Sequence, residues 1–115
     1  MDHLKVSARQ SEIQLKIFLD QNNVPENILW EASDADEEKH EAKALLLGLW
    51  DKNQGNGVSI DLWTKEMTVP EMNIFFYQTF LSMSDTIHRA TQDKTISDFI
   101  RNFASTFLEK INSTP

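Results

Sequence analysis

The sequence contains no cysteine, and it has only three glycines and three prolines. The absence of thiols excludes disulfide frameworks, cysteine-ligated zinc, iron–sulfur clusters and cysteine nucleophiles. Basic residues are also scarce, since 11 Lys and Arg stand against 18 Asp and Glu, for a net charge of −7. Because nucleic acids are bound through clustered basic side chains, no nucleic-acid partner is expected.

Long apolar runs are missing as well. The longest extends over the seven residues from Ala44 to Trp50, against the ~20 that a membrane-spanning helix needs. Residues 1–11 are mostly polar and lack the pattern of a signal peptide, so we expect a flexible arm there. Without a signal, anchor or lipidation motif, the expected location is the cytoplasm. The length of 115 residues, 40% of them hydrophobic, fits a single domain over residues 12–112.

Period-two alternation predicts the first strands. Aliphatic residues at 13, 15, 17 and 19 would share one face of a strand, and residues 28–32 form a second extended piece with Trp30. Residues 33–41 are too polar to pack and are interpreted as an acidic loop. Residues 43–50 fit either a strand or a helix, and we prefer the strand because a turn follows. That turn, residues 51–57 with Gly55 and Gly57, would join it to the alternating residues 58–62 in a β-hairpin.

After Trp63 the hydrophobic period changes to that of a helix. Thr68, Pro70 and Glu71 form an N-terminal capping signature, and the helix can continue to about Thr91. Thr95 is predicted to cap a second amphipathic helix that extends to the C-terminus. Strands followed by helices indicate an α+β fold, with an antiparallel sheet of three to four strands packed by two C-terminal helices.

Residue spacing gives little support for catalysis or metal binding. Asp85 and His88 are three residues apart on the first helix, but a metal site needs further converging ligands. Ser84 beside them suggests a triad, yet the spacing does not arrange the three groups in one hydrogen-bonded line. The loops at Asp34 and Asp51 fail the calcium-binding pattern. We therefore expect no catalytic, cofactor-binding or metal-binding residues, with a small metal-dependent enzyme using Asp85 and His88 as a remote alternative.

The apolar residues of the hairpin cannot all face one side. If Leu45, Leu47 and Leu49 face the helices, side-chain alternation turns their neighbours outward. Such a surface exceeds what monomers usually expose, so a protein partner is expected to cover it. On the first helix, three further residues widen the apolar surface. The interface candidates are Phe18, Leu46, Trp50, Trp63, Ile74, Tyr77 and Leu81. A helical segment at 43–50, or an acidic loop folded over the patch, would remove this argument.

Several motifs in the chain match one known family. They are Val24-Pro25-Glu26, Trp30, Glu41-Ala-Lys-Ala44, Trp50-Asp51, Ile60-Asp-Leu-Trp-Thr-Lys-Glu-Met67, Glu71-Met72, Phe75-Phe-Tyr-Gln-Thr79, Asp85-Thr86 and Arg89-Ala-Thr91. With them the sequence resembles the gliding motility-associated protein GldC family of Bacteroidetes, over about residues 12–110. The extended N-terminal arm and the loop at Gly55 and Gly57 diverge from it.

The resemblance implies a small accessory protein of the gliding machinery without enzymatic activity. The order of strands and helices is also similar to that of the export chaperone SecB. That likeness is one of architecture and leaves function open. The expected partners are a second copy of the chain, in a dimer or tetramer, and unidentified motility or exported proteins. The alternative is a holdase for exported proteins.

Overall fold

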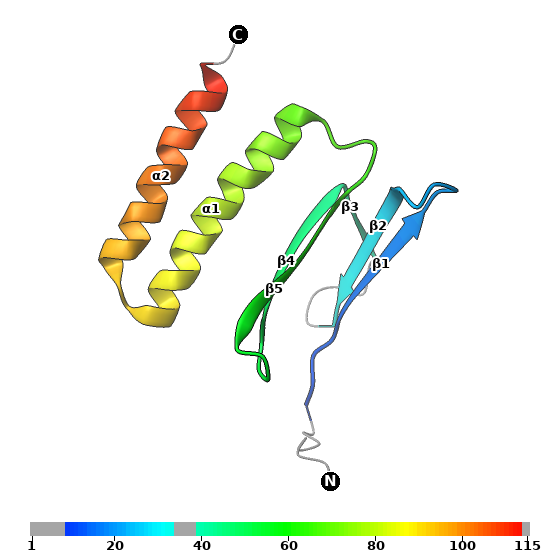
Figure 1. The fold of residues 1–115 in the computed structure, drawn as a ribbon, viewed down its shortest axis with the longest axis horizontal. Coiled ribbons are helices and arrows are strands. Elements are labelled where there is room, and N and C mark those ends of the chain that lie inside the picture. Colours follow the sequence, from blue (N-terminus) through cyan, green and yellow to red (C-terminus); the bar gives the residue numbers. More distant parts are fainter. Residues whose placement is uncertain (1–8, 34–38, 114–115) are drawn as a thin grey trace. The chain divides into compact units, whose positions relative to one another are not determined.

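The computed structural model describes residues 9–33 and 39–113, and its contacts divide the chain into two compact units, Met1–Met67 and Thr68–Pro115. The first unit contains the strands and the second contains the helices (Figure 1). The expected N-terminal arm, residues 1–11, lies mostly outside the described residues. The expected single domain over residues 12–112 stays a prediction, as does packing of the helices on the sheet.

Three antiparallel strands form the first sheet, in the order β1 (Ile13–Leu19), β2 (Pro25–Ala32) and β3 (His40–Ala42). Leu15 lies opposite Trp30 and Ile17 opposite Ile28, so the predicted aliphatic face of β1 shares one side of the sheet with Ile28. That side chain is buried. The aliphatic alternation read from residues 13–19 is therefore confirmed as a strand.

The second sheet is a hairpin of β4 (Ala44–Asp51) and β5 (Asn56–Trp63). The predicted strand at residues 43–50 is confirmed from Ala44 onward, and the helical alternative is wrong. In the turn, Gly55 adopts a left-handed φ of 68°, which glycine reaches without steric cost. The Gly55 N–H donates to the Asp51 carbonyl at 2.9 Å, and the Gln54 N–H donates to the Asp51 carboxylate at 2.6 Å.

Only Lys43 separates β3 from β4. The Thr64 N–H donates to the Lys43 carbonyl at 2.8 Å, which extends the β4–β5 ladder by one step. One extended segment, residues 40–51, thus pairs with β2 through its first part and with β5 through its second. This change of partner at Lys43 is why the chain forms two sheets, of three and two strands, where the sequence predicted one sheet of three to four.

The strand β3 also corrects the expected acidic loop at residues 33–41. Residues 34–38 of that loop lie outside the described residues, but His40 and Glu41 belong to a strand. His40 lies opposite Trp30, and their rings stack with centroids 4.6 Å apart. Backbone pairing with β2 and this aromatic contact hold a polar segment in a sheet that its composition did not predict.

The second unit is a pair of helices, α1 (Val69–Thr91) and α2 (Lys94–Asn112). At the start of α1 the predicted capping box is present. The Glu71 N–H donates to the Thr68 hydroxyl at 3.2 Å, and the Thr68 N–H donates to the Glu71 carboxylate at 3.0 Å. The predicted cap of α2 is wrong, because the Asp93 carboxylate accepts from the Ile96 N–H at 3.1 Å. The helix therefore starts at Lys94, two residues before a Thr95 cap would start it.

The two helices lie side by side and run in opposite directions (Figure 1). The buried residues of the two helices are small: Ser84 in α1, and Ser97 and Ala104 in α2. Each serine hydroxyl bonds across the pair, with Ser84 Oγ donating to the Ser97 carbonyl at 2.8 Å and Ser97 Oγ donating to the Ser84 carbonyl at 2.9 Å. Next to them, the ring of Phe80 packs edge-on against Phe103 and Phe107.

Candidate interaction surface

Two of the three residues weighed for catalysis, Asp85 and Ser84, are engaged in structural contacts of their side chains. The Asp85 carboxylate accepts from Arg101 of α2 at 2.7 Å in an exposed ion pair. The Ser84 hydroxyl is buried and bonds to Ser97 rather than to a histidine. Across the part of the chain that the structure describes, no three His, Asp or Glu side chains gather in a way that could hold a metal ion.

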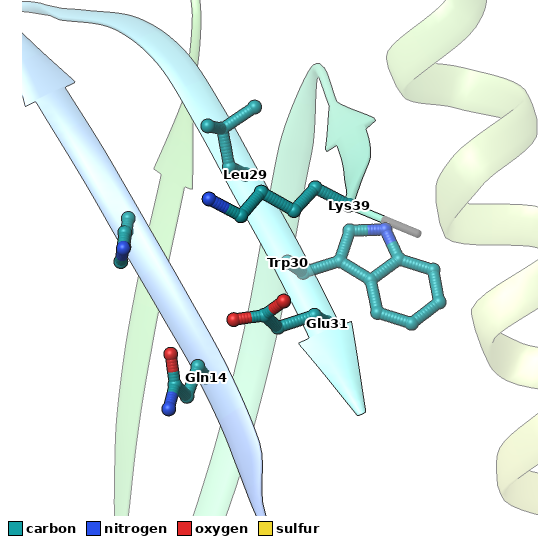
Figure 2. Close-up of a pocket in the computed structure, with 6 residues that line it drawn as sticks. Gln14, Leu29, Trp30, Glu31 and Lys39 are labelled. Carbon is teal, nitrogen blue, oxygen red and sulfur yellow. The ribbon is translucent and has the colours of Figure 1, made fainter. Parts of the chain in front are cut away.

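A small hollow lies on the three-stranded sheet beside Trp30. Figure 2 shows the side chains around it, which are Gln14, Lys16, Leu29, Trp30, Glu31 and Lys39. Its cavity volume is about 10 Å³, which is room for no more than one water molecule. A ligand of ordinary size does not fit there.

One carboxylate has a strongly displaced pKa, and its role is structural. The Lys65 ammonium, and after it the Val24 N–H, lower the pKa of Asp20 from 3.8 to about 2. The same bond to Asp20 raises the pKa of Lys65. Asp20 also accepts from the Asn22 N–H at 2.7 Å and from the Val24 N–H at 3.0 Å. These bonds shape the turn between β1 and β2 and join it to the segment after β5.

The hairpin presents one face that carries two tryptophans. Register places Trp63 opposite Ala44, Leu46 opposite Asp61 and Trp50 opposite Gly57, and opposite residues of an antiparallel pair share a face. Leu46, Trp50 and Trp63, here called the tryptophan face, are 40%, 74% and 56% exposed. The structure thus brings three of the predicted interface residues to one side of one hairpin.

A hollow borders this face at its Trp63 end. It has a volume of about 330 Å³ and is lined by Asn23, Val24, Pro25, Asp61, Leu62 and Trp63. The turn after β1 therefore lies beside the end of β5, and apolar side chains of both form the wall. Such a hollow can receive one large side chain of a bound protein.

The opposite side of the hairpin is aliphatic throughout, and sequence reasoning named only half of it. Register places Leu45 opposite Leu62, Leu47 opposite Ile60 and Leu49 opposite Val58. This leucine face, made of these six residues, includes three that are exposed: Leu49, Val58 and Ile60. Both sides of the hairpin are therefore apolar.

The other predicted interface residues belong to other elements than the hairpin. Phe18 is exposed in β1 of the other sheet, opposite Asn27. Ile74, Tyr77 and Leu81 belong to the helical unit, where helical spacing places them on one stripe of α1. Ile74 is exposed, and the other two are half-buried.

Sequence reasoning missed exposed aromatics on α2. Phe99 and Phe103 are both exposed, although the periodicity of the helix suggested a conventional buried stripe. That stripe was the available signal. It identifies an apolar face but not whether anything covers it.

Comparison with known proteins adds one match. Residues 25–113 match the GldC-like family, described as gliding motility-associated protein GldC-like. Neither the curated proteins nor the solved structures contain a significant match to the chain. Among the described residues, no helix is both long and apolar enough to cross a membrane. The family match covers most of the chain and includes β2 to β5 and both helices, so this protein belongs to the GldC-like family of gliding motility-associated proteins.

Proposed function

We propose that this protein is a non-enzymatic accessory component of the gliding machinery that binds another protein through the tryptophan face. Family membership supports the link to gliding. The observation that carries the binding role is the exposure of Trp50 and Trp63 on one side of the β4–β5 hairpin. Tryptophan supplies a large contact area for little loss of conformational freedom, and it is enriched among residues that dominate binding energy.

Charge on the chain favours a partner with basic residues. The tryptophan face carries Asp61 beside its apolar residues, and the whole chain has a net charge of −7. A partner with a basic rim around an apolar centre would be steered toward this face. A motility protein of this kind, in the cytoplasm, is the partner we propose.

The test replaces the chromosomal copy in a gliding strain with Trp50→Asp. A charge buried in an apolar interface is strongly unfavourable, so we expect gliding to fall to the level of a deletion strain. Asn53→Asp is the matched control, because it adds the same charge at an exposed position of the adjacent turn. Normal gliding by a Trp50→Asp strain that contains wild-type amounts of folded protein would overturn the proposal.

A second candidate is a holdase for exported proteins, supported by the exposed leucine face. Unfolded chains display apolar segments that such a surface can cover. We expect the purified protein, in molar excess, to slow the aggregation of heated citrate synthase. Leu49→Lys should abolish the effect, and Lys52→Gln, in the adjacent turn, should not. Aggregation at the unassisted rate would rule the holdase out.

A further inference from the structure

The outer edge of β5 carries backbone groups that no strand of the described residues pairs with. The bond from the Thr64 N–H to the Lys43 carbonyl shows that Thr64 and Lys43 form a hydrogen-bonded pair. Hydrogen-bonded pairs alternate along an antiparallel ladder, so the even-numbered residues of β5 bond to β4. The N–H and C=O groups of residues 57, 59, 61 and 63 therefore point outward. Within residues 9–33 and 39–113, the second sheet contains β4 and β5 alone, so these outward groups form an edge that no described strand pairs with.

This edge lacks most of the features by which proteins normally protect strands from pairing. From Asn56 to Trp63 it contains no lysine, no proline and no register shift, and its one charged side chain is Asp61. The edge strand β1 differs, since it contains Lys16 and a register shift between Phe18 and Leu19. A long regular edge with aliphatic side chains along one face and Trp63 on the other is a template for another strand.

The sequence of β5 is complementary to itself in one antiparallel register. With Ile60 opposite Ile60 of a second copy, Val58 meets Leu62 and Ser59 meets Asp61. Every aliphatic residue of the strand then faces another aliphatic residue, and Asp61 avoids its own copy. A shift by two residues in one direction places Asp61 opposite Asp61. A shift in the other direction places Leu62 opposite Asn56.

The backbone agrees with this register. Residues 57, 59, 61 and 63 are the ones with outward groups, and the register pairs them with each other, 57 with 63 and 59 with 61. About eight inter-chain hydrogen bonds would form. The two leucine faces would adjoin on one side and the two tryptophan faces on the other.

We infer that two copies of this chain associate by antiparallel pairing of their β5 edges about a two-fold axis at Ile60. The product is a continuous four-stranded sheet, in the order β4, β5, β5 and β4. Its tryptophan face has twice the area of one hairpin. The inference uses the backbone edge and is independent of the proposed gliding function.

Cysteine cross-linking of the full chain tests the register, because the protein has no cysteine of its own. In Ile60→Cys the two thiols would lie across a non-hydrogen-bonded pair, where the Cα separation of about 4.5 Å permits a disulfide. Val58→Cys is the matched control, since residues 58 and 60 share a face and are 51% and 50% exposed. In the inferred dimer its two thiols lie about 13 Å apart along the strands.

We expect Ile60→Cys to form a disulfide-linked dimer at least about tenfold faster than Val58→Cys under mild oxidation. Equal rates would overturn the inference. Light scattering that finds only monomer at every concentration would also overturn it. In that case a second copy does not pair with the β5 edge, and a helix or a different protein covers it instead.

Charge at Ser59 supplies a second test that leaves the β4–β5 ladder intact. The β4 residue opposite Ser59 is Gly48, which offers no side chain. In the dimer, Ser59→Asp would face Asp61 of the second copy and Ser59→Lys would attract it. Because the contact occurs twice, we expect the dimer dissociation constant to rise about fivefold with Asp and to fall by a similar factor with Lys. Equal effects of the two variants would contradict the register.

Discussion

Asp20 and Lys65 form an ion pair that joins the turn after β1 to the segment that follows β5. The two residues are far apart in the sequence, and the Asp20 side chain is only 12% exposed. The carboxylate also accepts the N–H groups of Asn22 and Val24. One side chain therefore organises a turn and fastens it to the hairpin.

This pair predicts an acid-sensitive stability. The pKa of Asp20 is lowered to about 2 from 3.8. A group whose pKa is lower in the folded state stabilises fully above its unfolded pKa, and the stabilisation is lost as the pH falls through its folded pKa. We expect the free energy of unfolding to decrease between about pH 4 and pH 2, as measured by urea denaturation.

The variant Asp20→Asn isolates the contribution of the Asp20 charge to the pH dependence of stability. The amide oxygen can still accept the turn N–H groups but carries no charge for Lys65 to neutralise. The variant should be less stable at pH 7, and its stability should change less between pH 4 and pH 2. An acid response equal to that of the wild type would assign the dependence to other carboxylates.

Sequence reasoning succeeded where the signal is local. The alternation at residues 13–19 and the capping box at Thr68 depend on neighbours along the chain, and both are present in the structure. The alternation of side chains along β4, which places Leu46 and Trp50 on one face and Leu47 on the other, is equally local. The tryptophan face was therefore predictable from the strand assignment.

The failures have a common physical origin in non-local pairing. β3 is three residues long and polar, and it is a strand because β2 supplies its backbone bonds. The change of partner at Lys43 and the unpaired edge of β5 depend on which strands pair with each other, and the composition of each segment does not determine this. The cap of α2 failed differently, because Asp93 and Thr95 are both suitable residues, and the helix begins at the first.

The cap correction gives a second prediction. Asp93→Ala removes the acceptor of the Ile96 N–H and should lower the free energy of unfolding by about 1 kcal/mol. Thr95→Ala, within the first turn of the helix, should change it by less than about 0.5 kcal/mol. Thermal or urea denaturation of both variants compares them directly. A larger loss for Thr95→Ala would restore threonine as the cap.

The buried serine pair gives a third prediction. Ser84→Ala removes a hydroxyl that donates to the Ser97 carbonyl at 2.8 Å and lies 2.9 Å from the Ser97 hydroxyl, and the loss of such a hydrogen bond should lower the free energy of unfolding by about 0.5–1.5 kcal/mol. Because the two hydroxyls share bonds, the double variant with Ser97→Ala should cost less than the sum of the single variants. Ser82→Ala, at an exposed position two residues earlier in α1, is the control. If the loss of unfolding free energy in the double variant equals the sum of the losses in the two single variants, the two hydroxyls act independently.

The turn of the β4–β5 hairpin gives a fourth prediction. Gly55 has a φ of 68°, and an alanine there should lower the free energy of unfolding by about 1–2 kcal/mol. Gly48 is the matched control within the same hairpin. Its φ is not positive, and a Cβ added there meets no atom within 4 Å. Gly48→Ala should therefore be neutral or stabilise by up to about 1 kcal/mol, because it restricts the unfolded chain. Urea denaturation of the two alanine variants measures the contrast, and a Gly55→Ala protein as stable as Gly48→Ala would show that the turn adopts another conformation in solution.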